Sequence, residues 1–250
     1  MLKQKQNIGV KKVLVELKHE FSDNFEGAVS LFYPFICFVC DNDLPVGVKN
    51  VCPTCQSNFQ RTYFEKMGED NPAKKIFWGR IEVENVFCLL TYSEDNSTKI
   101  ILNRIKYKKA QRLGVFMGEL LGKLMKENHD YEDIEAVIPI PLHEKKEYIR
   151  GYNQSLTICN GVSNTTNLPV YDVLRRRRHH ESQTTKNRFE RSDNVKDIFD
   201  VKKGKKMPYQ HIAIVDDVLT TGSTVESAYL ALKHYFPEIK ISVLTIAIAR

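Results

Sequence analysis

The sequence HIAIVDDVLTTGSTV at residues 211–225 decides the fold of this chain. It begins with a continuous apolar run at 212–215, which is typical of a strand buried on both faces of a parallel sheet. Asp216 and Asp217 follow at the carboxyl end of that strand, where open α/β sheets bind their ligands. A short turn then leads into a helix predicted from Val225 onward, so the stretch predicts one strand–turn–helix unit.

The turn after the acidic pair has the composition of a phosphate site. Hydroxyl groups, backbone N–H groups and a glycine lie together at a helix N-terminus, which is how proteins bind phosphate. The residues concerned are Thr220, Thr221, Gly222, Ser223 and Thr224. The simpler interpretation is a tight turn with two solvated aspartates and a hydroxyl N-cap. A P-loop is excluded, because the GxxxxGK[ST] pattern and its lysine are missing.

The overall composition is that of an ordinary globular protein. The 250 residues are 42% hydrophobic and 27% charged, enough for one large domain or a medium domain with a small appendage. The net charge of +6 favours polyanionic ligands, although a lysine excess is often only a solvated surface. Apolar runs are too short for a membrane span and the N-terminus lacks the apolar core of a signal peptide. We therefore expect a cytoplasmic protein without a membrane span.

Four of the six cysteines form two CxxC pairs, Cys37 with Cys40 and Cys52 with Cys55. Each pair can bring two thiolates to one ion, so the two pairs predict a tetrahedral zinc site. Without an export signal, metal is favoured over disulfides, and metal-free or redox-active thiols are the alternative. Four thiolates leave no open position for water, so zinc here would have a structural role.

Three segments follow from these patterns: an N-terminal helical segment at 1–36, a zinc ribbon with its connector at 37–79, and an α/β domain at 80–250. In the last segment, strands and helices alternate, which predicts a parallel sheet flanked by helices. Strands are expected at 81–92, 136–142, 169–174, 212–215 and 240–249, and helices at 97–106, 113–124 and 225–235. Cys88 and Cys159 are expected to be small core residues.

Two basic segments could contact anions. Residues 106–109 lie between two predicted helices, where a solvated turn is the simpler interpretation and an anion contact the alternative. Residues 143–155 follow a strand whose prolines bend the chain at its carboxyl end. Lys145, Lys146 and Arg150 in that segment suggest a second anion-binding loop, whereas a charged helix face is the simpler interpretation.

A polar stretch follows the predicted strand at 169–174 and continues to about residue 201. Loops of this length are uncommon unless they are lids, binding loops or disordered segments. Its position between two sheet strands favours a mobile lid. The arginine run at 175–178 also leaves contact with nucleic acid open.

Four motifs occur in one order along nearly the whole chain: the double CxxC, PIPLHEKKEYIRGYNQS at 139–155, SQTTKNRFERSDNV at 182–195 and VDDVLTTGST at 215–224. Together they resemble the ComF family, whose members join an N-terminal zinc ribbon to a type I phosphoribosyltransferase domain. Some members are linked to natural competence and DNA uptake. The resemblance therefore implies an α/β fold with a type I phosphoribosyltransferase-like parallel sheet and a small N-terminal zinc ribbon.

The resemblance also implies roles for particular residues. Asp216 and Asp217 would be catalytic and would bind the ribose 2- and 3-hydroxyls of phosphoribosyl pyrophosphate (PRPP), which carries Mg²⁺. The full PRPP site would comprise Val215, Asp216, Asp217, Thr220, Thr221, Gly222, Ser223, Thr224, Lys146 and Arg150. The lid motif would contribute Gln183, Arg191 and Asn194, and Cys37, Cys40, Cys52 and Cys55 would bind zinc. The chain differs from the family pattern at Lys146, His180 and Lys186, where arginine, threonine and leucine are usual.

The function implied is PRPP binding and transfer of its phosphoribosyl group to an unknown acceptor. In such a reaction the protein positions the ribose, neutralises the leaving pyrophosphate and excludes water. The alternatives are a non-catalytic competence factor that binds PRPP or single-stranded DNA, with competence proteins as partners, and a PRPP-sensing regulator. The interleaved aromatic residues typical of base stacking are not evident.

Overall fold

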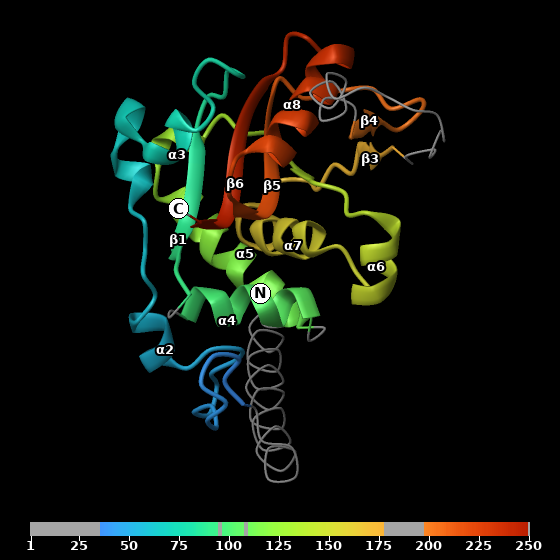
Figure 1. Ribbon diagram of the computed structural model, residues 1–250. Helices are drawn as coiled ribbons and strands as arrows, with labels where there is room; N and C mark the ends of the chain where they lie inside the picture. The colour runs from blue at the N-terminus through green and yellow to red at the C-terminus, as the bar shows by residue number, and fades with distance from the viewer. Residues whose placement is uncertain (1–35, 95–96, 108–109, 178–197, 250) are drawn as a thin grey trace, which may run out of the picture. The chain divides into compact units, whose positions relative to one another are not determined.

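A computed structural model describes residues 36–94, 97–107, 110–177 and 198–249 (Figure 1). The chain forms two compact units, residues 1–57 and 58–250. The helical segment predicted at 1–36 lies outside the described residues, except for Ile36.

The described part of the first unit is built from turns around its cysteines. Its one helix, α2 (Pro53–Ser57), is short, and an isolated antiparallel bridge joins Ile36 to Asp43. Asp41 and Asn50 have positive φ angles of 59° and 75°, so the chain reverses tightly at both.

The second unit is organised by a four-stranded parallel sheet with strand order β1-β6-β5-β2. Its members are β1 (Val86–Tyr92), β2 (Ala136–Pro139), β5 (His211–Leu219) and β6 (Lys240–Ala249). All three pairings between neighbouring strands are parallel, and Val215 of β5 lies opposite Pro139 of β2. The predicted fold class, a parallel sheet flanked by helices, is confirmed.

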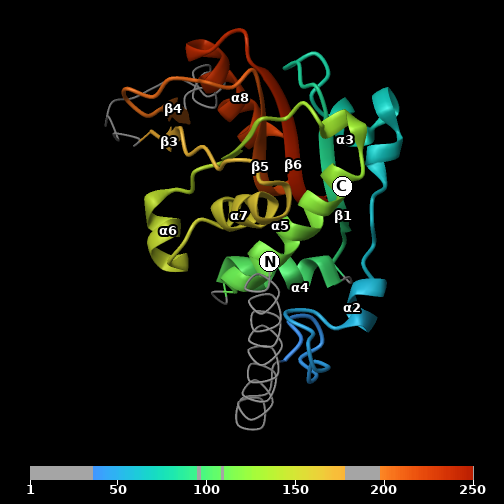
Figure 2. The same cartoon turned by 180° about the vertical axis from the view of Figure 1, so that it is seen from behind.

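Helices connect the strands and cover both faces of the sheet (Figures 1 and 2). The helices of this unit include α3 (Pro72–Lys75), α4 (Ser97–Tyr107), α5 (Gln111–Lys126), α6 (Glu144–Arg150), α7 (Gln154–Thr166) and α8 (Ser223–Tyr235), of which α6 lies away from the sheet and buries no residue. Helices α5 and α7 pack directly on each other, and a Cβ atom at Gly118 or Gly161 would overlap the backbone of the other helix. Small residues at this contact therefore let the two backbones approach closely.

The core repeats the two-residue period of the strands. Ile212 and Ile214 of β5 belong to the cluster that also holds Leu232 of α8, whereas Ala213 and Val215, also fully buried, lie outside that cluster. Both faces of the sheet are thus buried, as the continuous apolar run predicts. Cys88 and Cys159 are fully buried, as expected.

The segment predicted as a connector packs on β1. Phe64 and Phe77 are buried in the main core cluster. The Oδ1 of Asn71 accepts hydrogen bonds from the N-terminal N–H groups of α3, and its Nδ2 donates to the carbonyl of Val86 at 2.6 Å. Residues 58–79 therefore cover the sheet edge and lie in the second unit.

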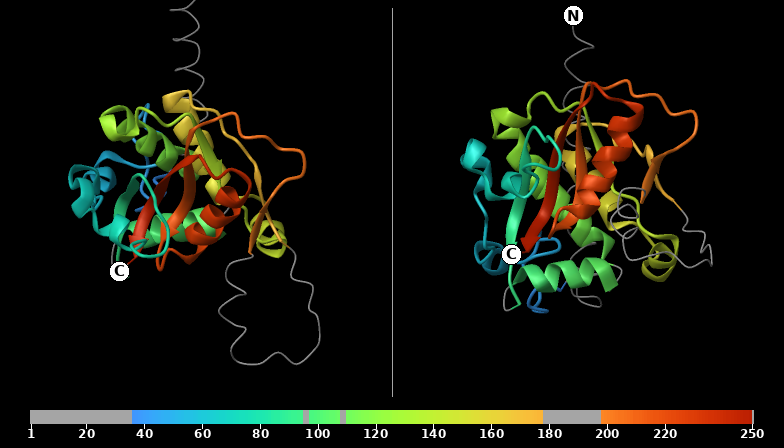
Figure 3. Two further views of the ribbon diagram at one scale, coloured as in Figure 1. Left: turned by 90° about the horizontal axis from the view of Figure 1, so that it is seen from above. Right: turned by 45° about the horizontal axis from the view of Figure 1, so that its top comes forward.

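The prediction of a strand at 169–174 is wrong. Only Val170 forms a parallel bridge, to Val137, because the chain then leaves this sheet and pairs Leu174 with Val201. β3 (Leu174–Arg176) and β4 (Phe199–Val201) form a separate antiparallel pair beside α8 (Figure 3).

The arginine run at 175–178 begins in a strand rather than in a loop. Arg175 and Arg176 lie in β3, and Arg175 forms an ion pair with the buried Asp200 at 2.6 Å. Sequence patterns did not reveal this strand because its outward positions are charged. On α4, Ile101 and Ile105 are buried, whereas Ile100 is 39% exposed because it lies off the buried stripe.

Candidate functional site

The acidic pair lies within β5 rather than after it. Pairing with β6 continues past Asp216, which is opposite Thr245, to Leu219, which is opposite Ile248. The strand is thus longer than predicted, because backbone hydrogen bonding to β6 continues where the apolar run ends. The pair still belongs to the carboxyl-terminal half of the strand, at the sheet edge where ligands of α/β proteins bind.

Asp216 is held by two hydrogen bonds to one of its oxygens. Its Oδ1 accepts from the hydroxyl of Ser155, on α7, at 3.1 Å and from the backbone N–H of Asp217 at 2.9 Å. Burial, together with the neighbouring carboxylate of Asp217, raises the pKa of Asp216 to about 7. Asp216 therefore changes its protonation state near neutral pH.

Asp217 has a different partner. Its Oδ2 lies 3.3 Å from Nζ of Lys106, at the end of α4, and the side chains are 11% and 21% exposed. For Lys106, the interpretation as a solvated basic turn is wrong, because the helix end brings its ammonium to a buried carboxylate. Lys108 and Lys109 lie outside the described residues.

Each carboxylate keeps one oxygen available. Within the described residues, Oδ2 of Asp216 and Oδ1 of Asp217 have no protein hydrogen-bond donor. Two adjacent acceptors of this kind can bind two adjacent hydroxyl groups of one ligand. The simpler interpretation of two solvated aspartates does not fit, because Asp217 is 8% exposed.

The turn after β5 is shaped by a glycine. Gly222 has φ 77°, and a Cβ atom there would lie 2.7 Å from Cε1 of Phe77. The hydroxyls of Thr221 and Ser223 lie 2.8 Å apart, and no side chain caps the N-terminus of α8. The predicted hydroxyl N-cap is therefore absent at this helix, and the first-turn N–H groups remain available to an anion.

Arg80 fixes this turn from the outside. Its Nη1 donates to the carbonyl of Thr221 at 2.7 Å, and its Nη2 forms an ion pair with Glu226 in the first turn of α8. The turn is thus tied both to the segment after α3 and to its own helix. This arrangement fixes the backbone conformation before any ligand binds.

The RGYNQS motif joins three elements at the same edge of the sheet. Asn153 caps α7 by accepting from the N–H of Ser155, and its Nδ2 donates to the carbonyl of Ile140 after β2 at 2.9 Å. The Tyr152 hydroxyl donates to the carbonyl of Ile105 in α4. The motif thereby places the hydroxyl of Ser155 within hydrogen-bond distance of Asp216.

The predicted pyrophosphate residues lie on α6. Lys146 is exposed on this helix, and the guanidinium of Arg150 lies 5.4 Å from the ring centre of Tyr107. The structure therefore places Arg150 beside the end of α4. The lid residues Gln183, Arg191 and Asn194, and His180 and Lys186, lie outside the described residues.

In the first unit, the four predicted zinc ligands converge. The sulfurs of Cys37, Cys40, Cys52 and Cys55 all lie within 4.8 Å of one another. The distance between those of Cys40 and Cys52 is 3.9 Å, close to the roughly 3.8 Å expected for tetrahedral Zn–S bonds of about 2.3 Å. The backbone N–H groups of Val39 and Cys52 donate to Sγ of Cys37. The cluster could therefore hold a structural zinc ion.

Cys37 and Cys55 differ in their ionisation. Burial opposes the thiolate of Cys37, but backbone hydrogen bonds to the sulfur outweigh it and lower its pKa to about 7. Burial and hydrogen bonds with the other three thiols raise the pKa of Cys55. A thiolate that forms near neutral pH is the state in which cysteine binds metal.

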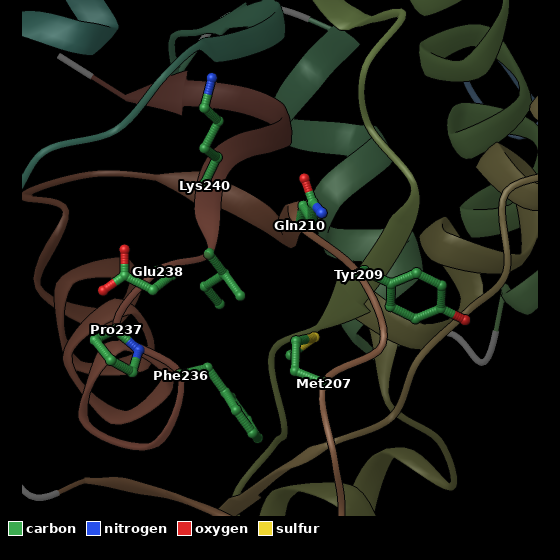
Figure 4. A pocket seen from close by; sticks show the side chains of 8 residues that line it. Met207, Tyr209, Gln210, Phe236, Pro237, Glu238 and Lys240 are labelled. Atoms are coloured by element: carbon green, nitrogen blue, oxygen red, sulfur yellow. The ribbon is translucent and has the colours of Figure 1, made fainter.

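A pocket of about 440 Å³ lies away from the acidic pair (Figure 4). Its lining includes Gln210, just before β5, and Lys240, at the start of β6, so it opens at the amino-terminal edge of the sheet. Met207, Tyr209 and Phe236 supply much of its apolar lining. The pocket and the candidate site are therefore separate features.

Within the described residues, no helix combines the length and apolar character that a membrane span requires.

Three residues contribute to the site without a predicted role: Lys106, Ser155 and Arg80. Ser155 lies in the RGYNQS motif, and Lys106 lies in the basic segment at 106–109. Their partners could not be predicted, because each contact joins elements far apart in the sequence. Arg80 had no sequence signal.

Comparisons with known proteins place this site in context. No family model matches the chain. Competence protein F of Haemophilus influenzae is 26% identical over 227 residues, covering 84% of this chain and 96% of the relative. DNA utilization protein YhgH of Escherichia coli O157:H7 is 24% identical over 220 residues, covering 82% and 93%. Competence protein ComFC of Bacillus subtilis is 26% identical over 203 residues, covering 77% and 75%.

Among solved structures, the allosteric regulatory enzyme of purine biosynthesis is similar with a TM-score of 0.37 and 12% identity. The similarity covers 67% of this chain and 31% of that chain. The relatives named competence protein F, ComFC and YhgH confirm the resemblance to ComF proteins that the four sequence motifs predict.

Proposed function

We propose that this protein binds PRPP, together with Mg²⁺, at the acidic pair and the turn that follows it. One observation carries the proposal: Oδ2 of Asp216 and Oδ1 of Asp217 lack protein partners within the described residues, while the other oxygen of each carboxylate is held. Such a pair accepts hydrogen bonds from a vicinal diol. The adjoining turn offers backbone N–H groups and the Thr221 and Ser223 hydroxyls to a phosphate.

The chemistry proposed for this site is phosphoribosyl transfer. An acceptor nucleophile would form a bond to C1 of the ribose while the bond from C1 to pyrophosphate breaks. The acidic pair would fix the ribose hydroxyls and the turn would hold the 5-phosphate, so that C1 is presented in one orientation. Lys146 and Arg150 follow β2 at the same edge and would neutralise the departing pyrophosphate. Magnesium would supply further charge neutralisation when it arrives with PRPP.

The biological setting that we propose is DNA uptake, because relatives with similar sequences are named competence proteins and DNA utilization proteins. We propose that zinc occupies the cysteine cluster and stabilises the first unit. Competence proteins or single-stranded DNA would then be partners of the protein.

A second candidate is a non-catalytic factor that binds PRPP or single-stranded DNA. The net charge of +6 favours it, and DNA affinity would then fall steeply with salt concentration. Release of pyrophosphate that depends on an acceptor would support the enzyme. Salt-sensitive DNA binding that survives loss of both carboxylates would support the second candidate.

The proposal that the acidic pair binds a vicinal diol can be tested directly with two simple ligands. Ribose 5-phosphate and 2-deoxyribose 5-phosphate share the phosphate and differ in one hydroxyl of the diol. We expect calorimetric titration to show at least tenfold weaker binding of the deoxy sugar, because the missing hydroxyl leaves a buried carboxylate oxygen unpaired. Equal binding of the two sugars would contradict the role of the acidic pair. Asp172→Asn removes an exposed carboxylate paired with Lys202, so this variant should show the same difference between the two sugars as the wild type.

A further inference from the structure

Lys106 reaches the acidic pair from an element that none of the sequence motifs includes. It lies in the last turn of α4, and its Nζ is 3.3 Å from Oδ2 of Asp217. Both side chains are largely shielded from solvent, at 21% and 11% exposure. An ion pair in this setting is screened less than a pair on the open surface.

The end of α4 is anchored on both sides of Lys106. The hydroxyl of the buried Tyr152 donates to the carbonyl of Ile105, the preceding residue. The guanidinium of Arg150 lies over the ring of Tyr107, the following residue, at 5.4 Å. Both anchors come from residues 150–152, at the end of α6 and just after it, so this segment fixes where the ammonium group of Lys106 lies.

The same segment also orients the other carboxylate. Three residues after Tyr152, Ser155 donates its hydroxyl to Oδ1 of Asp216 at 3.1 Å. Residues 150–155 thus control both members of the pair, Asp216 directly and Asp217 through Lys106. Within the described residues, these contacts engage one oxygen of each carboxylate and leave the other without a protein donor.

We propose that Lys106 is a positioning residue for the ligand diol: it holds Oδ2 of Asp217 so that Oδ1 is presented to a ligand hydroxyl. The proposal deepens the proposed function and rests on it for the identity of the ligand. It assigns Lys106, the first residue of the basic segment at 106–109, a role in ligand binding. It also makes α4 part of the site.

Among the residues that the structure describes, few charges face the pair. Asp216 interacts with Asp217 on its own strand, with Lys106 from α4 and with the uncharged hydroxyl of Ser155 from α7. Across the sheet, β6 places the uncharged Thr245 opposite Asp216. Among the described residues, Lys106 is the cation that pairs with these carboxylates, so its loss would make the pair retain a proton to higher pH.

The test compares Lys106→Met and Lys106→Arg with wild type. Ribose 5-phosphate binding is measured by calorimetry between pH 5.5 and 9. We expect Lys106→Met to weaken binding about tenfold at pH 7 and to move the pH midpoint of binding upward. Lys106→Arg should keep the wild-type midpoint, because it keeps the positive charge. Lys99→Met, which removes a lysine of the same helix that pairs with Glu94, should change neither quantity.

An unchanged affinity and pH midpoint in Lys106→Met would overturn the proposal, and so would a Lys106→Arg midpoint equal to that of Lys106→Met. A ligand-free measurement separates this proposal from the proposed function. Carboxyl ¹³C NMR should show the midpoint of Asp216, about 7 in wild type, rising in Lys106→Met but not in Lys99→Met. An unshifted midpoint would refute the role of Lys106 even if the sugar binds. A shifted midpoint in a protein that binds no sugar would refute only the proposed function.

Discussion

Gly222 provides the sharpest test of how the turn after β5 is built. The residue has φ 77°, a left-handed conformation that costs any other L-residue about 1–2 kcal/mol. A Cβ atom there would also lie 2.7 Å from Cε1 of Phe77 and 3.1 Å from Cγ2 of Ile76. Phe77 is 1% exposed and cannot move away freely, so overpacking adds about 1–3 kcal/mol. We therefore expect Gly222→Ala to lower the free energy of unfolding by about 2–5 kcal/mol.

Gly204→Ala is the matched control. Gly204 has φ 76°, almost the same as Gly222, but a Cβ atom there would meet nothing within 4 Å. This variant should show the backbone cost alone, about 1–2 kcal/mol. Urea unfolding followed by circular dichroism measures both free energies. Equal losses in the two variants would refute the steric argument. A cycle with Phe77→Leu should recover part of the Gly222→Ala loss, because the smaller side chain relieves the overlap.

Three other predictions follow from single contacts. Asn71→Ala should lower the free energy of unfolding by about 2–3 kcal/mol, since it removes the cap of α3 and the donor to the Val86 carbonyl; a loss below about 0.5 kcal/mol in urea unfolding would contradict this. The pKa of Asp216 is raised from 3.8 to about 7, so its ionisation lowers the free energy of unfolding as pH rises through that interval. Asp216→Asn should reduce the slope of this fall by no more than about 1.4 kcal/mol per pH unit. An unchanged dependence of stability on pH in this variant would refute the prediction. One zinc ion per chain should be released by a chelator and lost in Cys37→Ser, whereas Cys159→Ser should keep it; retention in Cys37→Ser would exclude the cysteine site.

The sequence predicts the parts of this fold whose signals are local. The apolar run before Asp216 predicts β5, and the small-residue turn after it predicts the start of α8, because each depends on neighbouring residues. The two CxxC pairs predict a cluster for the same reason. The ion pair between Lys106 and Asp217 could not be predicted, because only the packing of α4 against the sheet edge brings those residues together.

Other differences also arise from tertiary packing. The polar segment at 58–79 is connector-like in sequence, yet Asn71 satisfies a carbonyl of β1 and Phe77 fills the core. β3 could not be predicted because Arg175 and Arg176 give it a polar composition. In the structure, Asp200 of β4 forms an ion pair with Arg175. In each case a buried partner from a distant segment overrides the local pattern.

The central claim is that the acidic pair and its turn bind a phosphoribosyl group. The most direct test is calorimetric titration of PRPP with Mg²⁺ into the zinc-loaded wild type and into the Asp216→Asn/Asp217→Asn double variant. Circular dichroism would confirm that both proteins are folded. We predict saturable binding to the wild type and its loss in the double variant. No binding to the folded wild type, or equal binding to both proteins, would contradict the claim.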